Sequence, residues 1–461
     1  MPKLYILLAS TALLTTSCAS APPFASTDAG VTPAPVWTSA PDLSADQLDD
    51  WVASFNDPAL ARLVSQADSA NYNLAAAVAR YDAALASARS ANSGRMPSIG
   101  ASGGATQREA NAGSSTTYTL GASVSWEADI WGRLGDRAQA GLADARASEA
   151  DLQAARLSVA ASVAKGWFFL IEARLQSELA AFDVETKEQS LSLVDRRFQR
   201  GVSRSSDVRT ARSALASSQA ALASRLRTEA AAARSLEILL GEYPDGELPH
   251  DVDLPELGPL AGVGAPGDLL ARRPDVVAAE ARLASAGYRA SEARKALLPR
   301  LSLTGSADTS GLDLGDLIDS DALIGSLIGN LTAPIFSGGA LRAERDRTLA
   351  SARAQLAVYA NTVLTAWREA EDAIHADRIL AERVEALTAA AEEAAAAEEL
   401  VLRQYTSGVA TIFELLDAQS RRISSESFLI SARRERATNR VDLYLAIAGN
   451  YRTTPTVATE G

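Results

Sequence analysis

The sequence of 461 residues contains one cysteine and two histidines. A single cysteine cannot form an internal disulfide, and it cannot share a zinc ion with other thiolates. His250 and His375 are about 125 residues apart, and neither has a cysteine nearby that would complete a zinc-binding or catalytic group. The scarcity of these residues therefore argues against a disulfide scaffold, a zinc site and histidine-based catalysis.

Aromatic residues and basic clusters are also scarce. Aromatic side chains make up 5% of the sequence, whereas hydrophobic residues make up 47%, so the apolar material is mainly alanine, leucine and valine. Small side chains of this kind favour closely spaced helices. The net charge is −13, and no segment concentrates lysine and arginine as phosphate binding requires, so a nucleic-acid partner is not expected.

The apolar run at the N-terminus predicts export from the cytoplasm. Lys3 precedes a short apolar stretch over residues 4–14, and residues 1–17 together resemble a signal peptide. No other apolar run approaches the roughly 18 residues of a membrane-spanning helix. We therefore expect an exported chain that is not held in the inner membrane by helices.

Cys18 follows this signal at a position that resembles a bacterial lipobox, although Thr15 stands where leucine is usual. One interpretation is that Cys18 becomes the first mature residue and carries a diacylglycerol and an N-acyl chain. The alternative is that the signal peptide is cleaved near Cys18 and no lipid is attached. Residues 18–41 are rich in Pro, Ser, Thr and Ala, which is typical of an extended tether. No other cofactor is expected.

The chain contains a long internal repeat. Two similar turns, with glycines at Gly201 and Gly408, lie about 207 residues apart, and Pro97 and Pro299 keep nearly the same period. The predicted first repeat covers residues 42–241, a connection rich in Pro and Gly covers 242–267, and the second repeat covers 268–449. Residues 450–461 are predicted to be a disordered tail.

Each repeat has the same predicted order of elements. In the first, a helix over 71–92 precedes strands over 98–106 and 118–127, a polar loop over 107–117 lies between them, and helices over 136–199 and 205–240 follow. In the second, the corresponding ranges are 275–297, 300–308, 322–335, 340–404 and 411–448. A helix of about 64 residues rises about 95 Å, so end-to-end packing of the shorter helices beside it predicts a rod about 100 Å long.

The four strands have the length that crosses a membrane. Four strands cannot close a barrel, and a barrel in lipid leaves no free edge. Three copies of the chain would supply twelve strands. The predicted fold is therefore mainly α-helical with a transmembrane β part, and the predicted assembly is a homotrimer in lipid.

Several motifs resemble those of one protein family. The first two lie at strand-to-helix junctions, the third at the start of the second-repeat barrel strands and the last at the helical turn: Trp126-Glu127-Ala128-Asp129-Ile130-Trp131-Gly132-Arg133, Ala333-Pro334-Ile335-Phe336-Ser337-Gly338-Gly339, Leu298-Pro299-Arg300-Leu301-Ser302-Leu303, and Tyr405-Thr406-Ser407-Gly408-Val409 with Leu415-Leu416-Asp417-Ala418-Gln419. Together they resemble the TolC-like and OprM-like outer-membrane factors of tripartite efflux systems, in the NodT-type lipoprotein branch.

The resemblance implies a trimeric duct in the outer membrane of a Gram-negative bacterium. Such a duct has a twelve-stranded β-barrel continued by a periplasmic α-helical barrel, and it works passively with a periplasmic adaptor and an inner-membrane pump of the resistance-nodulation-division type. Gly201, Val202, Gly408 and Val409 match the tip turns that contact the adaptor. Two positions depart from the family pattern: Met96 precedes Pro97 in place of an aromatic residue, and Ala410 stands where some members place an arginine.

The expected gate residues each have an alternative role. Glu414 and Asp417 would form acidic rings that favour cations, or they would complement a helix dipole. Phe413 would narrow the closed tip, or it would pack between helices. Tyr405 and Asp207 would link neighbouring hairpins, or Tyr405 would pack in a core while Asp207 caps a helix.

Two other patterns are weaker. Residues 262–267 match a dinucleotide fingerprint in letters only, since no strand precedes them and Pro266 interrupts them. Asp313, Asp316, Asp319 and Asp321 lack the spacing of a calcium loop and are expected to keep an extracellular loop solvated.

Alternatives to an efflux channel remain. A coiled-coil adaptor or structural protein bridging two membranes is one, and an exit duct for type I protein secretion is another. An enzyme is not expected, because no nucleophile, base and orienting group converge.

Overall fold

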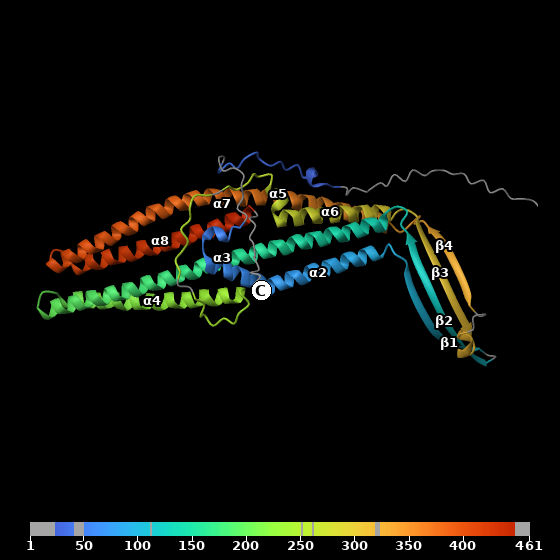
Figure 1. Ribbon diagram of the computed structural model, residues 1–461, viewed down its shortest axis with the longest axis horizontal. Coiled ribbons are helices and arrows are strands. Elements are labelled where there is room, and N and C mark those ends of the chain that lie inside the picture. The colour runs from blue at the N-terminus through green and yellow to red at the C-terminus, as the bar shows by residue number, and fades with distance from the viewer. Residues whose placement is uncertain are drawn as a thin grey trace, which may run out of the picture. The chain divides into compact units, whose positions relative to one another are not determined.

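The computed structural model describes residues 24–40, 50–110, 113–249, 252–260, 262–318 and 323–447 (Figure 1). Cys18, His250, Asp319, Asp321 and the predicted tail therefore lie outside the described residues. The helices in chain order are α1 (Pro58–Ala70), α2 (Tyr72–Ser93), α3 (Arg133–Gln199), α4 (Ser205–Leu239), α5 (Leu269–Arg272), α6 (Pro274–Lys295), α7 (Ala340–Ser407) and α8 (Ile412–Ala446). Short 3-10 helices occupy Ser26–Ala29, Ala53–Phe55 and Leu314–Ile318.

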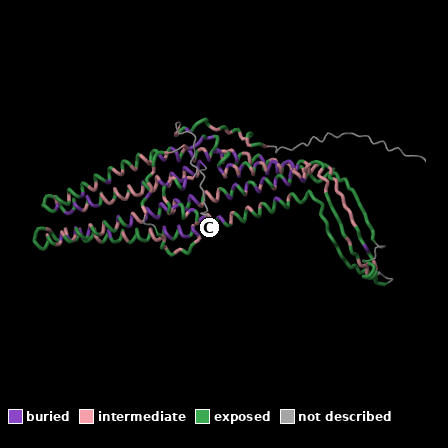
Figure 2. The backbone as a smooth tube through the Cα atoms, viewed as in Figure 1, coloured by how far each residue is buried: buried purple, intermediate pink, exposed green. Residues whose placement is uncertain are grey.

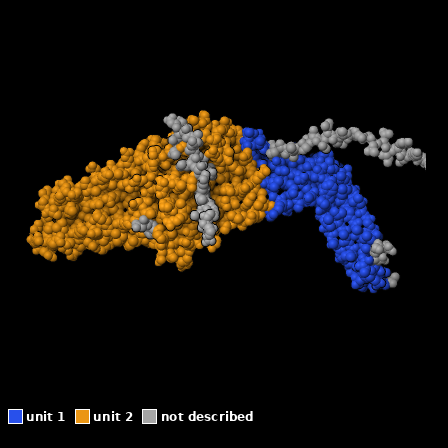
Figure 3. Space-filling view, viewed as in Figure 1, with its two compact units in different colours: residues 1–28, 86–144, 282–356 blue, residues 29–85, 145–281, 357–461 orange. Residues whose placement is uncertain are grey.

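The chain divides into two compact units, shown in different colours in Figure 3. The first contains the strands and the helical residues nearest to them, within 86–144 and 282–356. The second contains the remaining helical parts and the connection between the repeats, within 29–85, 145–281 and 357–461. Each unit draws on both halves of the chain, so the two repeats fold together.

The strands of the first unit form one antiparallel sheet in the order β1-β2-β3-β4. They are β1 (Ser98–Ala110), β2 (Gly113–Ala128), β3 (Arg300–Gly311) and β4 (Ile324–Thr332). Each repeat contributes one strand pair, and β2 joins the pairs by pairing with β3. The predicted duplication and the four membrane-length strands are thereby confirmed.

The predicted polar loop over residues 107–117 is wrong. Strand β1 continues to Ala110 and β2 begins at Gly113, so nearly all of that stretch is strand. Polar side chains such as Gln107 and Thr116 stand opposite each other in the ladder, and backbone pairing extends the hairpin even though the apolar alternation has ended. In the second repeat the prediction was too long instead, because β4 covers only Ile324–Thr332.

The helices of the second unit start and stop close to the predicted residues. Asp57 caps α1 by accepting hydrogen bonds from the backbone N–H groups of Ala59 and Leu60 at 2.8 and 3.0 Å. Asn71 begins α2 in the same way, through Asn73 and Leu74. These caps satisfy backbone donors that the first turn of a helix leaves free.

An aromatic cluster forms part of the core of the second unit. Trp51 stacks on Tyr444 with ring centroids 6.0 Å apart, and Phe55 meets Phe168 at 5.0 Å. Trp167, beside Phe168, donates its indole N–H to Asp57 at 2.6 Å. These few aromatic residues therefore tie α1, α3 and α8 together, whereas most of the remaining core consists of alanine, leucine and valine.

One described helix, α3, is long and apolar enough by length and composition to cross a membrane. The sequence had predicted no such segment beyond the N-terminus. Trp167, Leu170 and Ile171 of α3 are fully buried against the rest of the second unit, and a core helix of this kind satisfies the same criterion.

The described part of the N-terminal segment is fixed to the helices. Trp37 is buried and donates its indole N–H to the carbonyl of Gly264 at 2.8 Å. The backbone N–H groups of Thr38 and Ser39 donate to the two oxygens of Glu371 at 2.7 and 2.9 Å. Although partial burial opposes it, hydrogen bonding to Ser39 and Thr38 lowers the pKa of Glu371. The segment is thus attached to the helices over residues 37–39, and Ser26–Ala29 forms a short 3-10 helix.

Candidate functional site

The sheet has two chemically different faces. Pairing places Trp126 opposite Leu303, Val124 opposite Gly305, and Leu301 opposite Leu331, so apolar residues of neighbouring strands lie on one face. On the edge strand β4 these side chains are largely exposed, with Leu327 and Leu331 at 80% and 70%, whereas Trp126, Val124, Leu301 and Leu303 on β2 and β3 are partly covered. Figure 2 shows that most of the sheet is exposed. A broad exposed apolar face on a membrane-length sheet is suited to lipid contact.

The opposite face is lined mainly by small polar residues. Ser123 faces Ser306, Ser125 faces Thr304, and Ser98 lies opposite Ser125 with their hydroxyl oxygens 2.7 Å apart. Glycines leave space for larger neighbours, since the carboxylate of Asp308 lies where a side chain at Gly121 would stand. Such a face is suited to lining water.

The strand-to-helix junction of the first repeat is held by buried charges. Arg133 donates to both oxygens of Glu127 at 2.9 Å and reaches Glu292 of α6 at 3.5 Å. Lys295 pairs with the buried Asp136 at 2.7 Å. Trp131 donates its indole N–H to the carbonyl of Pro299 at 2.7 Å. The motif at residues 126–133 therefore fixes the start of α3 against the start of β3.

The two tip turns have the backbone conformation that the repeat predicted. Gly201 has φ +77° and Gly408 has φ +85°, a region that residues with a Cβ rarely adopt. The amide of Val202 donates to the carbonyl of Arg197 at 2.9 Å, and the amide of Val409 donates to the carbonyl of Gln404 at 2.9 Å. This pattern is the Schellman ending of a helix. It leaves Val202 and Val409 exposed at the ends of the helical hairpins.

A small hydrophobic cluster joins the two hairpins just behind these turns. Its buried members come from α3, α4, α7 and α8: Val194, Val208, Ala211, Tyr405, Ile412 and Leu415. Arg197 of α3 lies over the ring of Tyr405 at 4.8 Å and donates to its carbonyl at 2.6 Å. Arg197 is therefore a link between the repeats that the sequence did not reveal, since its partner Tyr405 lies about 208 residues away in the other repeat.

The structure does not bring Asp207 and Tyr405 into a hydrogen bond within one chain. The Asp207 carboxylate accepts the backbone N–H of Arg204 at 3.0 Å and so caps α4. The Tyr405 hydroxyl is buried and has no hydrogen-bond partner of acceptable geometry among the described residues. Burial raises the pKa of Tyr405, Arg197 and the nearby Ser203 hydroxyl oppose that shift, and the charge of Asp207 adds to it.

The acidic residues of the α8 start have partners of their own. Glu414 forms a capping box with Thr411, accepting its backbone N–H at 2.6 Å, and hydrogen bonding from Thr411 lowers the pKa of Glu414. Asp417 pairs with Arg421 at 2.7 Å on an exposed face. Phe413, which precedes Glu414, is 60% exposed within one chain.

A buried polar seam crosses from α3 to α8 behind the tip. Lys187 donates to Gln419 at 3.0 Å, and Gln419 donates to Ser190 at 2.9 Å. Burial lowers the pKa of Lys187, although Asp183, 3.5 Å away, opposes the shift. Sequence reasoning missed this seam because each partner lies on a long helix that carries many ordinary surface charges.

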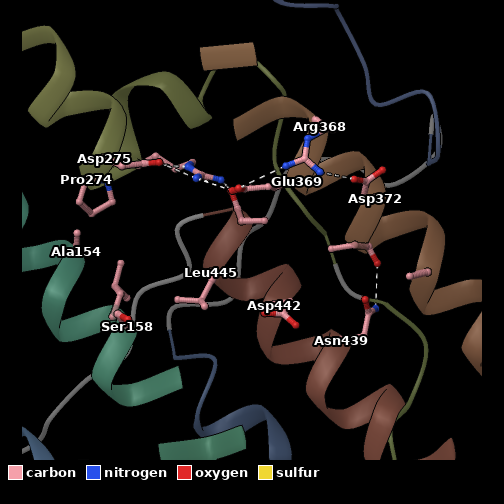
Figure 4. Close-up of a pocket in the computed structure, with 15 residues that line it drawn as sticks. Ala154, Ser158, Pro274, Asp275, Arg368, Glu369, Asp372, Asn439, Asp442 and Leu445 are labelled. Atoms are coloured by element: carbon pink, nitrogen blue, oxygen red, sulfur yellow. Dashed lines mark hydrogen bonds and ion pairs between the residues drawn. The ribbon is translucent and has the colours of Figure 1, made fainter. Parts of the chain in front are cut away.

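The cavity drawn in Figure 4 has a volume of about 590 Å³ and is lined by α3, α6, α7 and α8. Arg273 donates to Asp275 at 2.7 Å and to Glu369 at 2.8 Å. Although burial opposes it, hydrogen bonding and the charge of Arg273 lower the pKa of Asp275. Arg368 pairs with Asp372 at 2.9 Å, and Asp442 pairs with Lys165. The pair of Arg273 with Glu369 therefore joins the start of α6 to α7, and the pair of Lys165 with Asp442 joins α3 to α8, whereas Arg368 and Asp372 both lie on α7.

The weaker sequence patterns gain no support. Residues 262–267 lie in the connection before α5, and the carbonyl of Pro266 accepts a hydrogen bond from the indole N–H of Trp367 at 3.1 Å. Within the described residues no cluster of His, Cys, Asp or Glu could hold a metal ion. Asp313 and Asp316 lie beside β3, where the Asp316 carboxylate accepts the amide of Asp313 at 3.2 Å.

Comparison with known proteins agrees with the two-faced sheet and the repeated hairpins. The family model "Outer membrane efflux protein" matches residues 63–242 and 265–449. Outer membrane protein OprJ of Pseudomonas aeruginosa is 31% identical over 413 residues, which cover 87% of this chain and 86% of OprJ. A probable efflux pump outer membrane protein of Pseudomonas putida, TtgC, is 28% identical over 98% of this chain and 96% of TtgC.

A solved structure of the outer-membrane channel OprN has a TM-score of 0.84 to this chain at 29% identity, covering 91% of this chain and 97% of that one. The family model matches in both repeats. The chain therefore belongs to the outer membrane efflux protein family, a family of outer-membrane channels of efflux systems and not of enzymes.

Proposed function

We propose that this chain is one third of a passive exit duct for small molecules. The observation that carries the proposal is the sheet, which has an apolar face, a Ser/Thr face and two strands, β1 and β4, with one unpaired edge each. A four-stranded sheet in lipid needs partners for those edges. Three copies would give a closed barrel of twelve strands, with the polar faces around a water-filled lumen.

The helical hairpins would continue this barrel into the periplasm. Gly201, Val202, Gly408 and Val409 would form the surface that a periplasmic adaptor contacts, and the exposure of both valines supports this role. An inner-membrane pump, of the resistance-nodulation-division type, would supply the energy. Two relatives are named for antibiotic and toluene efflux, which favours small molecules such as drugs as the cargo.

We assign the periplasmic gate to Asp207, Tyr405 and Phe413, and ion selectivity to Glu414 and Asp417. The Tyr405 hydroxyl is buried and lies near Ser203 and Asp207, but it makes no well-formed hydrogen bond among the described residues, which supports a carboxylate of another copy as its partner in the closed tip. The exposure of Phe413 supports a position facing the lumen. Neither the coiled-coil adaptor nor the protein-secretion duct gains a specific observation in its favour.

The lipid anchor belongs to the same proposal. Phe24, six residues after Cys18, packs against Ala286, Ala290 and Ala352 in the strand-containing unit. Six residues span at most about 21 Å, so acyl chains on Cys18 would lie within that distance of this contact. Growth with a labelled fatty acid should label the wild type and leave Cys18→Ser unlabelled. Equal labelling of both would exclude Cys18 as the acylated residue.

Export is tested in a Gram-negative host that lacks its own outer-membrane efflux channel and carries the matching adaptor and pump genes. We expect this chain to fractionate with the outer membrane and to restore dye efflux and drug resistance. Recovery of the chain as a soluble periplasmic protein would contradict the channel. Restored secretion of a protein without restored dye efflux would instead support the secretion duct.

A further inference from the structure

The arginine of the first tip turn makes hydrogen bonds in both turns. Arg197 lies in the last turn of α3, and its carbonyl accepts the amide of Val202 at 2.9 Å, which closes the first turn. Its guanidinium donates to the carbonyl of Tyr405 at 2.6 Å. The same carbonyl accepts the amide of Gly408 at 3.1 Å within the second turn. Arg197 therefore ties together the ends of two long helices from different repeats.

The guanidinium holds Tyr405 in two ways. Tyr405 lies in the last turn of α7, where the final carbonyl groups lack the usual helical partner and the helix dipole favours a cation. The guanidinium carbon of Arg197 also lies 4.8 Å from the centroid of the Tyr405 ring, within the range of a cation–π contact. One attachment is to the backbone and the other is to the ring, so together they restrict both parts of the tyrosine.

The duplication provides an internal comparison. Gln404 and Tyr405 of the second turn occupy the positions of Arg197 and Phe198 in the first. The carbonyl of Gln404 accepts the amide of Val409 at 2.9 Å, just as the Arg197 carbonyl closes the first turn. The second turn therefore closes with a glutamine in the position of the arginine. It follows that the backbone of such a turn does not need the arginine side chain.

The two aromatic residues of the turns differ in what covers them. Tyr405 is 4% exposed and lies under the guanidinium from the other repeat, whereas Phe198 is 45% exposed. The arginine thus accompanies the aromatic residue that carries a hydroxyl. The contact between the repeats is the feature that distinguishes the two turns.

We infer that Arg197 is a positioning residue of the gate, which holds Tyr405 in place from the other hairpin. This inference rests on the proposed gate role of Tyr405 and adds the residue that orients it. With its backbone and ring fixed, the tyrosine keeps its hydroxyl near Ser203 and Asp207, in the place from which it would donate to a carboxylate of a neighbouring copy. Without the arginine, only the apolar cluster holds the ring, and apolar packing is not directional.

Single-channel recording in planar bilayers without adaptor tests this role. Arg197→Met keeps an unbranched side chain but removes the charge and all the donors. We expect its channels to be open about tenfold more often than the wild type, the same change as for Tyr405→Phe, because both lose the bond of the hydroxyl. Arg197→Lys keeps a cation without the planar guanidinium, so its opening should lie between the two.

Gln404→Met is the matched control. It places the same side chain at the repeat-related position of the other turn and leaves the contact of Arg197 with Tyr405 intact. We expect it to open within about twofold of the wild type, as substitutions away from specific contacts usually do. Opening of Gln404→Met as frequent as that of Arg197→Met would show that any change in these turns loosens the tip, and would overturn the inference.

The double variant separates positioning from an independent structural effect. If Arg197 acts through the Tyr405 hydroxyl, Arg197→Met with Tyr405→Phe should be no more open than the more open single variant. Effects that multiply to about a hundredfold would show that the two residues act separately. That result, or Arg197→Met channels that open like the wild type, would overturn the inference and leave the channel intact.

The amount of trimer in the outer membrane is measured for every variant. If Arg197→Met does not assemble, Arg197→Lys takes its place in the same comparison, and its excess opening should disappear in the Tyr405→Phe background. Excess opening that persists there would count against the positioning role. A wild-type chain that forms no channels in bilayers would instead overturn the proposed function on which the inference rests.

Discussion

Tyr405→Phe channels should be open about tenfold more often than the wild type in planar bilayers without adaptor. The substitution removes one hydroxyl and leaves the ring, its contact with Arg197 and the hydrophobic cluster in place. If that hydroxyl donates to a carboxylate of a neighbouring copy in the closed tip, its loss costs the closed state about 1.5–3 kcal/mol. A shift of 1.4 kcal/mol is a factor of ten in the equilibrium.

Asp207→Asn tests whether the carboxylate of Asp207 is the partner of the Tyr405 hydroxyl. Asparagine keeps an oxygen that can accept the amide of Arg204, so the α4 cap is preserved while the charge is removed. If the two residues are linked, the double variant should be no more open than the stronger single variant. Additive effects would show that they act separately, and unchanged opening in Tyr405→Phe would exclude its hydroxyl from the gate.

Glu414 and Asp417 should act on ion selectivity rather than on how often the channel opens. Glu414→Gln with Asp417→Asn should reduce cation preference and weaken block by multivalent cations, because each of three copies loses its carboxylate charges near the aperture. Glutamine can still accept the Thr411 amide, so the capping box is retained. Measured reversal potentials that do not change would place these residues away from the pore.

Gly408→Val should abolish export while the chain still inserts in the outer membrane. The glycine has φ +85°, and a residue with a Cβ in that region costs about 1–2 kcal/mol, more for a β-branched one. The strain falls on the turn that presents Val409, and a Cβ added at Gly408 would lie 3.9 Å from the guanidinium of Arg197. Drug susceptibility and outer-membrane fractionation measure the two properties separately.

Two glycine variants serve as controls for that result. Gly408→Asn should retain most export, since asparagine adopts the left-handed region more readily than other residues. Gly258→Ala, at a glycine with ordinary φ and open space around it, should behave as the wild type. Loss of insertion in Gly408→Val would show that this glycine serves folding rather than adaptor docking.

Most of the architecture could be predicted because it depends on local chemistry and on repetition. Gly201 and Gly408 ended the long helices where expected, and Asp57 and Asn71 began helices by capping them. The strand bounds were less predictable. The ends of β1 and β2 carry polar residues on both faces, so only the backbone ladder, which a sequence does not display, extends them.

The tip residues were predictable only in part, because some of their contacts join helices that are distant in the sequence. Positive φ at the tip glycines and exposure at Val202 and Val409 follow from the motif itself. The contacts of Arg197 with Tyr405 and of Lys187 with Gln419 join helices from different repeats. Such pairs depend on how two long helices are packed against each other, and neither partner has a distinctive neighbour in sequence.

Native mass spectrometry of the protein extracted from outer membranes tests most directly whether copies of the chain complete one another. Each chain supplies four strands with two unpaired edges. We predict a single assembly of three chains, with no stable monomer or dimer at the same detergent concentration. A stable monomer that remains inserted in the outer membrane would contradict the account, because its sheet edges would then have to be satisfied without further copies.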